Sequence, residues 1–315
     1  MNSMNNTGDS MPTDAIDTLE KIQGRFPGAR RAHAKGLFFE ATFRPNGNAI
    51  AYTTAAHLQK EAVSATVRFS NSPPNPTASD FLSPFKGMSV QFHLPDGTAS
   101  HLISTTIPIF ITKDPKTFID MLKILTATKT GMDKVDLGIG VLNIIKKYPE
   151  RKNILLALQE QFKQPPISYA LLHYYPIHAF YFVNQDGKRQ AIKYEWQPVQ
   201  EKEAWLEQPA AKITSPDYLE EDLHERLKNG PVSFNLVIRL GTKDDATDDP
   251  TVDWSEDRQQ IVVGQLTLNK ALFPNEPILF DPTIVTEGIE LTADPILHFR
   301  HDAYAVSYER RMKNE

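Results

Sequence analysis

The chain has 315 residues, of which 40% are hydrophobic and 23% charged, a balance typical of a globular protein with a sizeable core. Its net charge of −5 comes without a basic stripe or a polybasic run, so nucleic acids and anionic membrane surfaces are not expected partners. Cysteine is absent, which excludes disulfides, thiolate metal sites and iron–sulfur clusters.

The N-terminal residues have none of the features of a targeting segment. Residues 1–13 are polar and are expected to form a disordered tail, and they lack the basic and apolar regions of a secretory signal. No apolar run reaches the roughly 18 residues that suggest a membrane span. We therefore expect a soluble, cytoplasmic protein in which residues 14–315 form a single domain.

The first elements after the tail are a helix and then strands. The segment "TDAIDTLEKIQ" predicts a short helix with Thr13 as its N-cap, because its apolar residues recur at helical spacing. Between residues 37 and 103 the β-rich segments "LFFEATFRP", "VSATVRFSNS" and "GMSVQFHLPDG" predict strands. The last of these alternates strictly between apolar and polar positions, and "SHLISTTIPIFIT" follows its "LPDG" turn.

The second half begins with helices and ends with strands and a final helix. Residues 115–162 are predicted to be helical, starting at an Asp114 N-cap. Next come a hairpin around "NQDGK", a capped helix over residues 215–230, and the strands "PVSFNLVIRL" and "QQIVVGQLTL". The acidic "KDDATDDP" between these strands lacks EF-hand spacing and is interpreted as a surface loop. Because no βαβ alternation occurs, the pattern predicts an α+β fold with a mostly antiparallel sheet or barrel.

The last predicted helix runs from Asp294–Pro295 to about residue 312, and its spacing places several cationic and phenolic residues on one broad face: Arg300, Tyr304, Tyr308 and Arg311. A solvated cationic face is the simpler interpretation of this spacing. The alternative is a metal-binding phenolate. A phenol has a reference pKa of about 10, and an arginine one turn earlier favours its anion by charge and hydrogen bonding.

Five segments resemble haem catalases, in the same order along the chain: "RRAHAKGLFFEATF", "ATVRFSNS", "TTIPIFITKDPKTF", "VVGQLTLNK" and "DPTIVTEGIELTADPILHFRHDAYAVSYERR". The resemblance extends from about Arg30 to Arg311. Because the chain is much shorter than typical catalases, it is most similar to the small catalase-related haem peroxidases. The resemblance implies a haem catalase-like antiparallel β-barrel core with surrounding helices.

The resemblance also implies a distal catalytic group. His33 matches the distal histidine that moves a proton between the two peroxide oxygens. Ser70 matches the serine that bonds the far nitrogen of that imidazole and fixes its tautomer. Thr105 stands where catalases carry the distal asparagine, and Thr106 takes this place if the register shifts by one residue.

The cofactor implied by the resemblance is haem b, with Tyr304 as the iron ligand. The residues that match its other contacts are Arg300 as the partner of the tyrosine, Arg30, Arg68 and Arg311 at the propionates, and Phe110 and Phe118 against the porphyrin. If the resemblance is set aside, core packing is enough to explain the two phenylalanines, and the arginines are expected at the surface.

Three differences from catalases bear on which reaction the protein is expected to catalyse. Thr105 offers one donor in place of an amide, Ala32 replaces the usual valine, and Tyr308 replaces a histidine. A roomier distal pocket without the amide favours an organic electron donor over a second peroxide. We therefore expect a peroxidase acting on hydrogen peroxide or organic hydroperoxides, with weak catalase activity. A homo-oligomer is compatible with this sequence.

Three alternatives remain open at this point. One is a fatty-acid hydroperoxide isomerase of the allene oxide synthase type, which also has threonine at the position of the distal asparagine. The second is a haem carrier or sensor without turnover. The third is a barrel protein that binds a lipid and no metal.

Overall fold

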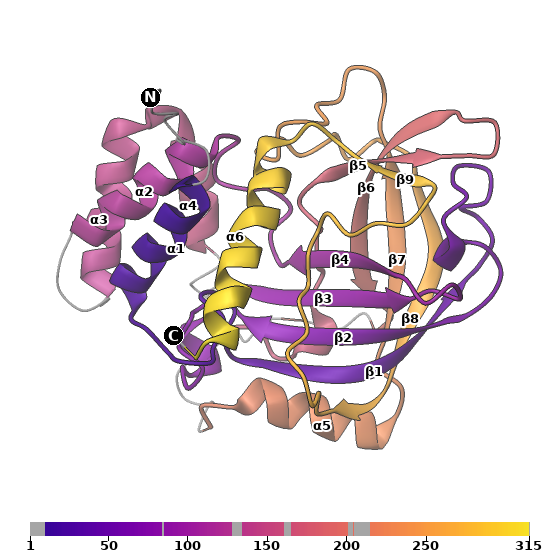
Figure 1. The fold of residues 1–315 in the computed structure, drawn as a ribbon, viewed down its shortest axis with the longest axis horizontal. Coiled ribbons are helices and arrows are strands. Elements are labelled where there is room, and N and C mark those ends of the chain that lie inside the picture. The colour runs from indigo at the N-terminus through magenta and orange to yellow at the C-terminus, as the bar shows by residue number, and fades with distance from the viewer. Residues whose placement is uncertain are drawn as a thin grey trace, which may run out of the picture.

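The computed structural model describes residues 10–83, 85–127, 134–160, 165–200, 204 and 215–314. Within these residues, nine strands form one antiparallel sheet in the order β4-β3-β2-β1-β8-β7-β6-β5-β9 (Figure 1). The strands are β1 (Gly36–Pro45), β2 (Val63–Asn71), β3 (Lys86–His93), β4 (Ala99–Thr105), β5 (Ala179–Val183), β6 (Arg189–Pro198), β7 (Ser233–Leu240), β8 (Gln260–Leu272) and β9 (Ile289–Leu291).

The sheet curls around one large apolar core. Side chains of alternate residues point to opposite faces of a strand, so β2 sends Val67 and Phe69 into the core and Arg68 and Ser70 to the outer face. The sheet closes through single bridges rather than a full ladder. The end of β4 pairs with Tyr175, whose neighbour pairs in turn with β6. The predicted antiparallel barrel core with surrounding helices is confirmed in this curled form.

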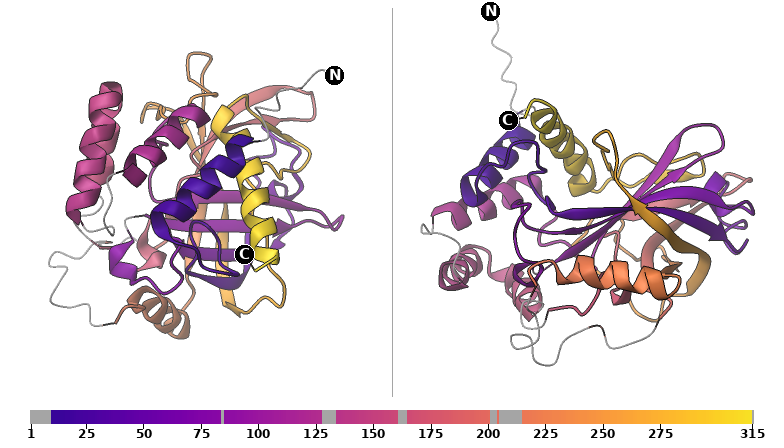
Figure 2. Two further views of the ribbon diagram at one scale, coloured as in Figure 1. Left: turned by 60° about the vertical axis from the view of Figure 1, so that its left-hand side comes forward. Right: turned by 90° about the horizontal axis from the view of Figure 1, so that it is seen from below.

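The helices are arranged around the sheet (Figures 1 and 2). Four of them form a layer beside the sheet: α1 (Ser10–Gln23), α2 (Pro115–Ala127), α3 (Lys134–Lys147) and α4 (Lys152–Glu160). The last helix, α6 (Pro295–Met312), runs between this layer and the strands, and α5 (Tyr218–Asn229) lies beside β1, at the bottom of Figure 1. Short 3₁₀ helices occur at η1 (Ala56–Leu58), η2 (Asp80–Leu82), η3 (Pro149–Arg151) and η4 (Tyr169–Leu171).

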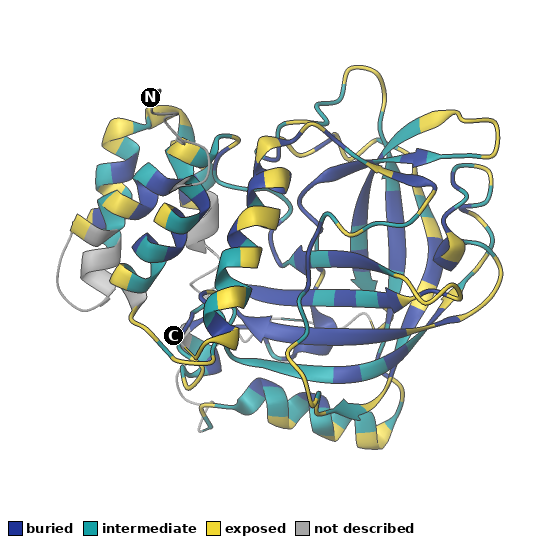
Figure 3. Cartoon of the chain, in the orientation of Figure 1, coloured by how far each residue is buried: buried dark blue, intermediate teal, exposed yellow. Residues whose placement is uncertain are grey.

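Helix α6 packs on both of its neighbours. An apolar cluster joins Phe299 and Ala303 of α6 to Ala15 and Ile16 of α1 and to Ile119 of α2. Figure 3 shows the opposite side of α6 exposed to solvent. Helix α6 is therefore fixed in one orientation, with this apolar side toward α1 and α2. No helix among the described residues is both long and apolar enough to cross a membrane.

Most of the predicted elements are confirmed, with shifts at two helix starts. The helix α1 begins at Ser10 rather than at Thr13, so the predicted tail of residues 1–13 is wrong for its last four residues, and residues 1–9 lie outside the described part. Pro12 is tolerated there because a first-turn amide needs no helical partner. The helix predicted from residue 215 begins at Tyr218 instead. Residues 128–133 and 161–162 of the predicted helical stretch are not among those described.

Candidate functional site

A cavity of about 400 Å³ lies between the outer face of the sheet and the helices, within the usual size range of cofactor pockets. Its walls come from the segment before β1, from β2, β3 and β4, and from α1, α2 and α6. All ten predicted site residues line this one cavity: Arg30, His33, Arg68, Ser70, Thr105, Phe110, Phe118, Arg300, Tyr304 and Arg311.

The sheet wall of the cavity follows from strand register. Ser70 of β2 pairs with Gly87 of β3, and Gly87 pairs in turn with Thr105 of β4. The three residues therefore form one row across the outer face, at the ends of their strands nearest to His33. Thr106 is buried and its hydroxyl accepts a hydrogen bond from the Lys86 amide at 3.3 Å. Thr105, and not Thr106, is thus the threonine at the cavity.

His33 is held by its backbone and by its ring. Its amide donates to the Ser72 carbonyl at 3.0 Å, and its own carbonyl accepts from the Arg68 guanidinium at 2.7 Å. The backbone φ is +54°, a left-handed value that non-glycine residues adopt only when their surroundings fix it. The ring Nδ1 lies 3.0 Å from the Ser70 hydroxyl, as the sequence predicts. Nε2 is the ring nitrogen left for a substrate.

The His33 imidazole is neutral at physiological pH. Burial, followed by the positive charges of Arg68 and Arg300, lowers its pKa from 6.5 to about 3. A neutral imidazole can accept a proton, so His33 is suited to act as a base over a wide pH range.

Gly87 is a site residue that the sequence did not reveal. A Cβ atom at this position would lie 2.7 Å from the Ser70 Oγ and 2.9 Å from the His33 Nδ1. Real Cβ atoms do not approach other atoms so closely, so any side chain here would push the His33–Ser70 pair apart. Gly36 has the same function for Arg68, because a Cβ there would overlap the guanidinium. The "HAKG" segment thus ends in a glycine for a steric reason.

On the opposite side of the cavity lining, α6 presents a phenol with a cationic partner. The Tyr304 hydroxyl accepts hydrogen bonds from Arg300 at 2.7 Å and 3.2 Å, one helical turn away. Both donors come from the same guanidinium, which stabilises negative charge on the phenol oxygen. This is the pairing predicted from the Arg–x–x–x–Tyr spacing.

A buried hydrogen-bond relay behind Arg300, formed by His178 and Asp294, was not predicted from the sequence. The third contact of the guanidinium is His178 Nε2 at 2.8 Å, and the His178 Nδ1 lies 2.6 Å from Asp294. Burial is the main cause of a His178 pKa of about 4, so the ring is neutral, and donates to Asp294 through Nδ1. Asp294 also caps α6 by accepting from the Ile296 amide at 2.8 Å. One carboxylate therefore both starts the helix and orients Arg300.

Arg30, Arg68 and Arg311 form a cationic cluster at the cavity. Arg30 and Arg311 both donate to the Ile278 carbonyl, at 2.6 Å and 3.3 Å. Burial and mutual repulsion lower the pKa of Arg30 to about 8, and within the described part of the chain no carboxylate offsets this. The Nε atoms of Arg68 and Arg311 are buried without a partner. The cluster therefore fits a ligand that carries carboxylates, as the haem propionates do.

The remaining predicted residues form an aromatic wall. The ring centroids of Phe110 and Phe118 lie 5.3 Å apart with the ring planes tilted by 44°, and Phe118 meets Phe299 of α6 edge-on at 6.3 Å. Phe118 is on α2, and the Phe110 backbone amide donates a hydrogen bond to the Pro250 carbonyl at 2.8 Å. An apolar, aromatic wall opposite a cationic rim suits a flat amphipathic ligand.

The curled antiparallel sheet, the distal histidine and the Arg–Tyr pair on the last helix define a protein of the catalase fold class. Comparison with known proteins agrees: the family model described as Catalase matches residues 10–314, and the chain belongs to this family.

Among the relatives, the "Catalase-related peroxidase" of Mycolicibacterium paratuberculosis is 32% identical over 97% of this chain and 96% of its own length. A protein of the same description from Synechococcus elongatus is 32% identical over 96% and 89%. A solved bacterial catalase superposes with a TM-score of 0.76 at 23% identity, and a fungal one with 0.78 at 19%. The superposition covers 91% of this chain but only 58% and 60% of those two catalases.

Proposed function

We propose that this protein is a haem b peroxidase of the cytoplasm that reduces hydrogen peroxide or organic hydroperoxides with electrons from a small organic donor. The observation that carries the proposal is the convergence of all ten predicted residues on one cavity. The names of the two full-length relatives support the same activity and do not favour a hydroperoxide isomerase or a carrier without turnover.

The proposal assigns the residues around the cofactor as follows. Tyr304 ligates the iron as a phenolate, with Arg300 stabilising the negative charge. Arg30, Arg68 and Arg311 bind the propionates, and Phe118 packs against the porphyrin. When bound, haem supplies the redox chemistry that cleaves the O–O bond, which no side chain of this protein can supply.

Proton transfer on the distal side of the cavity is carried out by His33, which Ser70 orients. The neutral His33 takes a proton from one peroxide oxygen at Nε2 and returns it to the other, which leaves as water or an alcohol. Ser70 holds Nδ1, so that the ring keeps one tautomer and one orientation during both transfers. Two electrons and two protons from the donor complete the reduction of each peroxide.

Thr105 supports a peroxidase rather than a fast catalase. It stands in the same row of strand ends as Ser70, with Gly87 between them, and offers one hydroxyl where an asparagine would offer an amide. Ala32, which is exposed and lines the cavity, leaves room for a donor larger than peroxide. We propose that disproportionation of hydrogen peroxide is slow compared with that of ordinary catalases.

The test is reconstitution of the protein with haem, followed by pyridine-haemochrome analysis and a visible spectrum. The wild type should bind one type of haem, b, with the spectrum of a phenolate ligand, and should oxidise a phenol with hydrogen peroxide. Tyr304→Phe removes the ligand, so its spectrum should change and its turnover should fall by about 100-fold or more. Tyr308→Phe, on the same helix, is the matched control. An unaltered spectrum and full turnover in Tyr304→Phe would refute the proposal.

A further inference from the structure

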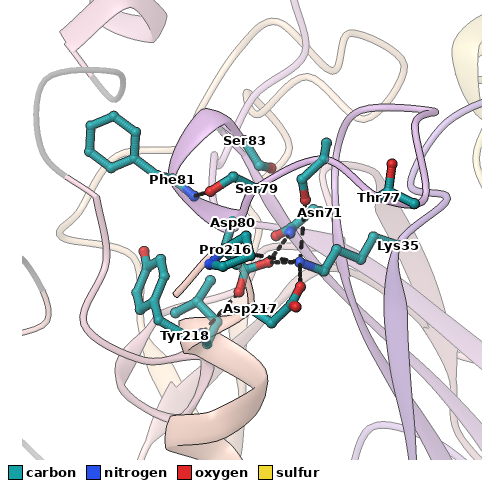
Figure 4. A network of polar contacts seen from close by, with 12 residues as sticks. Lys35, Asn71, Thr77, Ser79, Asp80, Phe81, Ser83, Pro216, Asp217 and Tyr218 are labelled. Atoms are coloured by element: carbon teal, nitrogen blue, oxygen red, sulfur yellow. Dashed lines mark hydrogen bonds and ion pairs between the residues drawn. The ribbon is translucent and has the colours of Figure 1, made fainter. Parts of the chain in front are cut away.

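A buried carboxylate outside the cavity, that of Asp80 in η2, collects bonds from three separate elements (Figure 4). Its Oδ1 lies 2.7 Å from the Lys35 ammonium and accepts from the Asn71 amide group at 2.6 Å. Its Oδ2 accepts from the Leu219 amide at the start of α5 at 2.9 Å. Only 1% of the residue is exposed, so these bonds replace water entirely. Asp80 does not line the cavity, and the chemistry proposed above makes no use of it.

Two of these partners close a ring with Asp80. The Asn71 backbone amide donates to the Lys35 carbonyl at 3.1 Å, while both side chains meet at Asp80 Oδ1. The ring therefore fixes the distance between the segment before β1 and the end of β2. The Tyr169 hydroxyl also donates to the Asn71 side-chain oxygen at 2.8 Å, which fixes the orientation of that amide.

Each distal residue has a near neighbour in the chain that is bonded to Asp80: Lys35 lies two positions after His33, Asn71 follows Ser70, and Lys86 precedes Gly87. The fully buried Lys86 reaches the Asp80 carbonyl at 2.8 Å rather than its carboxylate. A single residue thus holds the three backbone segments that bring the His33 ring, the Ser70 hydroxyl and the Gly87 hydrogen together.

We propose that Asp80 is a positioning residue for the distal histidine. It acts through Lys35 and Asn71, which keep His33 in its left-handed backbone conformation and its Nδ1 at 3.0 Å from Ser70. A buried ring of this kind is rigid because removal of any member leaves a buried polar group without a partner. The catalytic consequence rests on the proposed peroxidase function, whereas the effect on the His33 ring does not.

The experiment compares Asp80→Asn with Asp217→Asn. Asp217 also contacts the Lys35 ammonium, but it is half-exposed and does not bond Asn71 at the end of β2. The first readout is made on the haem-free, ¹⁵N-histidine-labelled protein, in which long-range ¹H–¹⁵N correlations report the tautomer of His33. Wild type and Asp217→Asn should show one tautomer. Asp80→Asn should show two tautomers, because the substituted amide replaces one carboxylate oxygen, an acceptor, by an NH₂ donor next to the Lys35 ammonium.

The second readout is the rate at which the haem-loaded protein reacts with peroxide. Asp80→Asn should be about 10- to 100-fold slower, as is usual when the support of a catalytic group is lost, with unchanged haem affinity. Lys35→Met should have the same effect from the opposite side of the ring, and Lys35→Arg, which keeps a donor, should retain the wild-type rate. A wild type without any reaction would refute the proposed function, and the haem-free spectra would still decide the role of Asp80.

Two results would overturn the inference. One is a folded Asp80→Asn protein with a single His33 tautomer and the wild-type rate. The other is loss of the fold in both Asp80→Asn and Lys35→Met, which would make the ring a determinant of folding and not of position.

Discussion

The two walls of the cavity hold their key side chains by different means. The distal wall is a sheet surface on which His33 is bonded to an uncharged hydroxyl and kept neutral by burial. The proximal wall is a helix on which Tyr304 is bonded to a cation that is itself held by a neutral imidazole and a buried carboxylate. A neutral imidazole is thus paired with an uncharged hydroxyl, and a phenol is paired with a cation.

The supports of the two walls also differ in where they come from in the chain. Around His33, the supporting residues are chain neighbours of the residues they support, such as Lys35 and Asn71. Behind Tyr304, the relay passes through His178, which lies far away in sequence, next to β5. The distal side is therefore built by strand register and the proximal side by a contact between distant segments.

The largest effect should come from removing the distal base. In haem-loaded His33→Ala, we expect the reaction with peroxide to slow by about 100- to 10,000-fold, because proton transfer is lost. Haem binding should persist, because the proximal wall is intact. Stopped-flow absorbance measures the rate. His93→Ala, which changes an exposed histidine on β3, should react like the wild type. Equal rates in both variants would show that the distal wall contributes no base.

A smaller effect should come from the proximal relay. Asp294→Ala removes the N-cap of α6 and leaves the His178 Nδ1 buried without an acceptor, so we expect the free energy of unfolding to fall by about 2–4 kcal/mol. The control is Asp114→Ala, which removes the cap of α2 but exposes no buried imidazole, and should cost about 1 kcal/mol. Urea unfolding measures both values. Equal losses would mean that the relay adds nothing to the cap.

The effect of acid on stability is the smallest of the three when it is expressed per residue and per pH unit. Burial is the main cause of the lowered pKa values of His33, His57 and His178, which fall to about 3, 3 and 4, against 6.5 in the unfolded chain. Between these values the unfolded chain binds more protons, so stability is full above pH 6.5 and decreases as the pH falls toward 4. Each histidine contributes a slope of up to about 1.4 kcal/mol per pH unit.

Urea titrations of the haem-free protein at several pH values measure this slope. His57 stacks on Phe92 with ring centroids 4.4 Å apart, and no residue in the described part of the chain bonds its Nδ1. His57→Phe should therefore keep the fold and lower the slope by up to about 1.4 kcal/mol per pH unit. A stability that does not change between pH 7 and 4 would contradict the neutral state of these rings, including that of His33.

The difference between the walls also explains what the sequence could predict. His33 and Tyr304 lie in continuous segments that resemble those of catalases, and this resemblance singles them out. The Asp294–Pro295 helix start is predicted from the sequence itself. The register of β4 against β3 was needed to choose Thr105 over Thr106. His178 belongs to no recognisable motif, because its role depends on a contact across the fold with Arg300 and Asp294. The sequence likewise gives no signal for Gly87, because only the pairing of β3 with β2 shows that a side chain would not fit there.

The position of α6 has a consequence for biosynthesis. The ribosome completes the sheet wall long before it makes the helix that bears Tyr304 and Arg311, and α6 is held in place by contacts to α1 and α2. A nascent chain lacks the α6 wall of the pocket until this helix has emerged from the ribosome. The pocket is therefore completed only when α6 docks against α1 and α2.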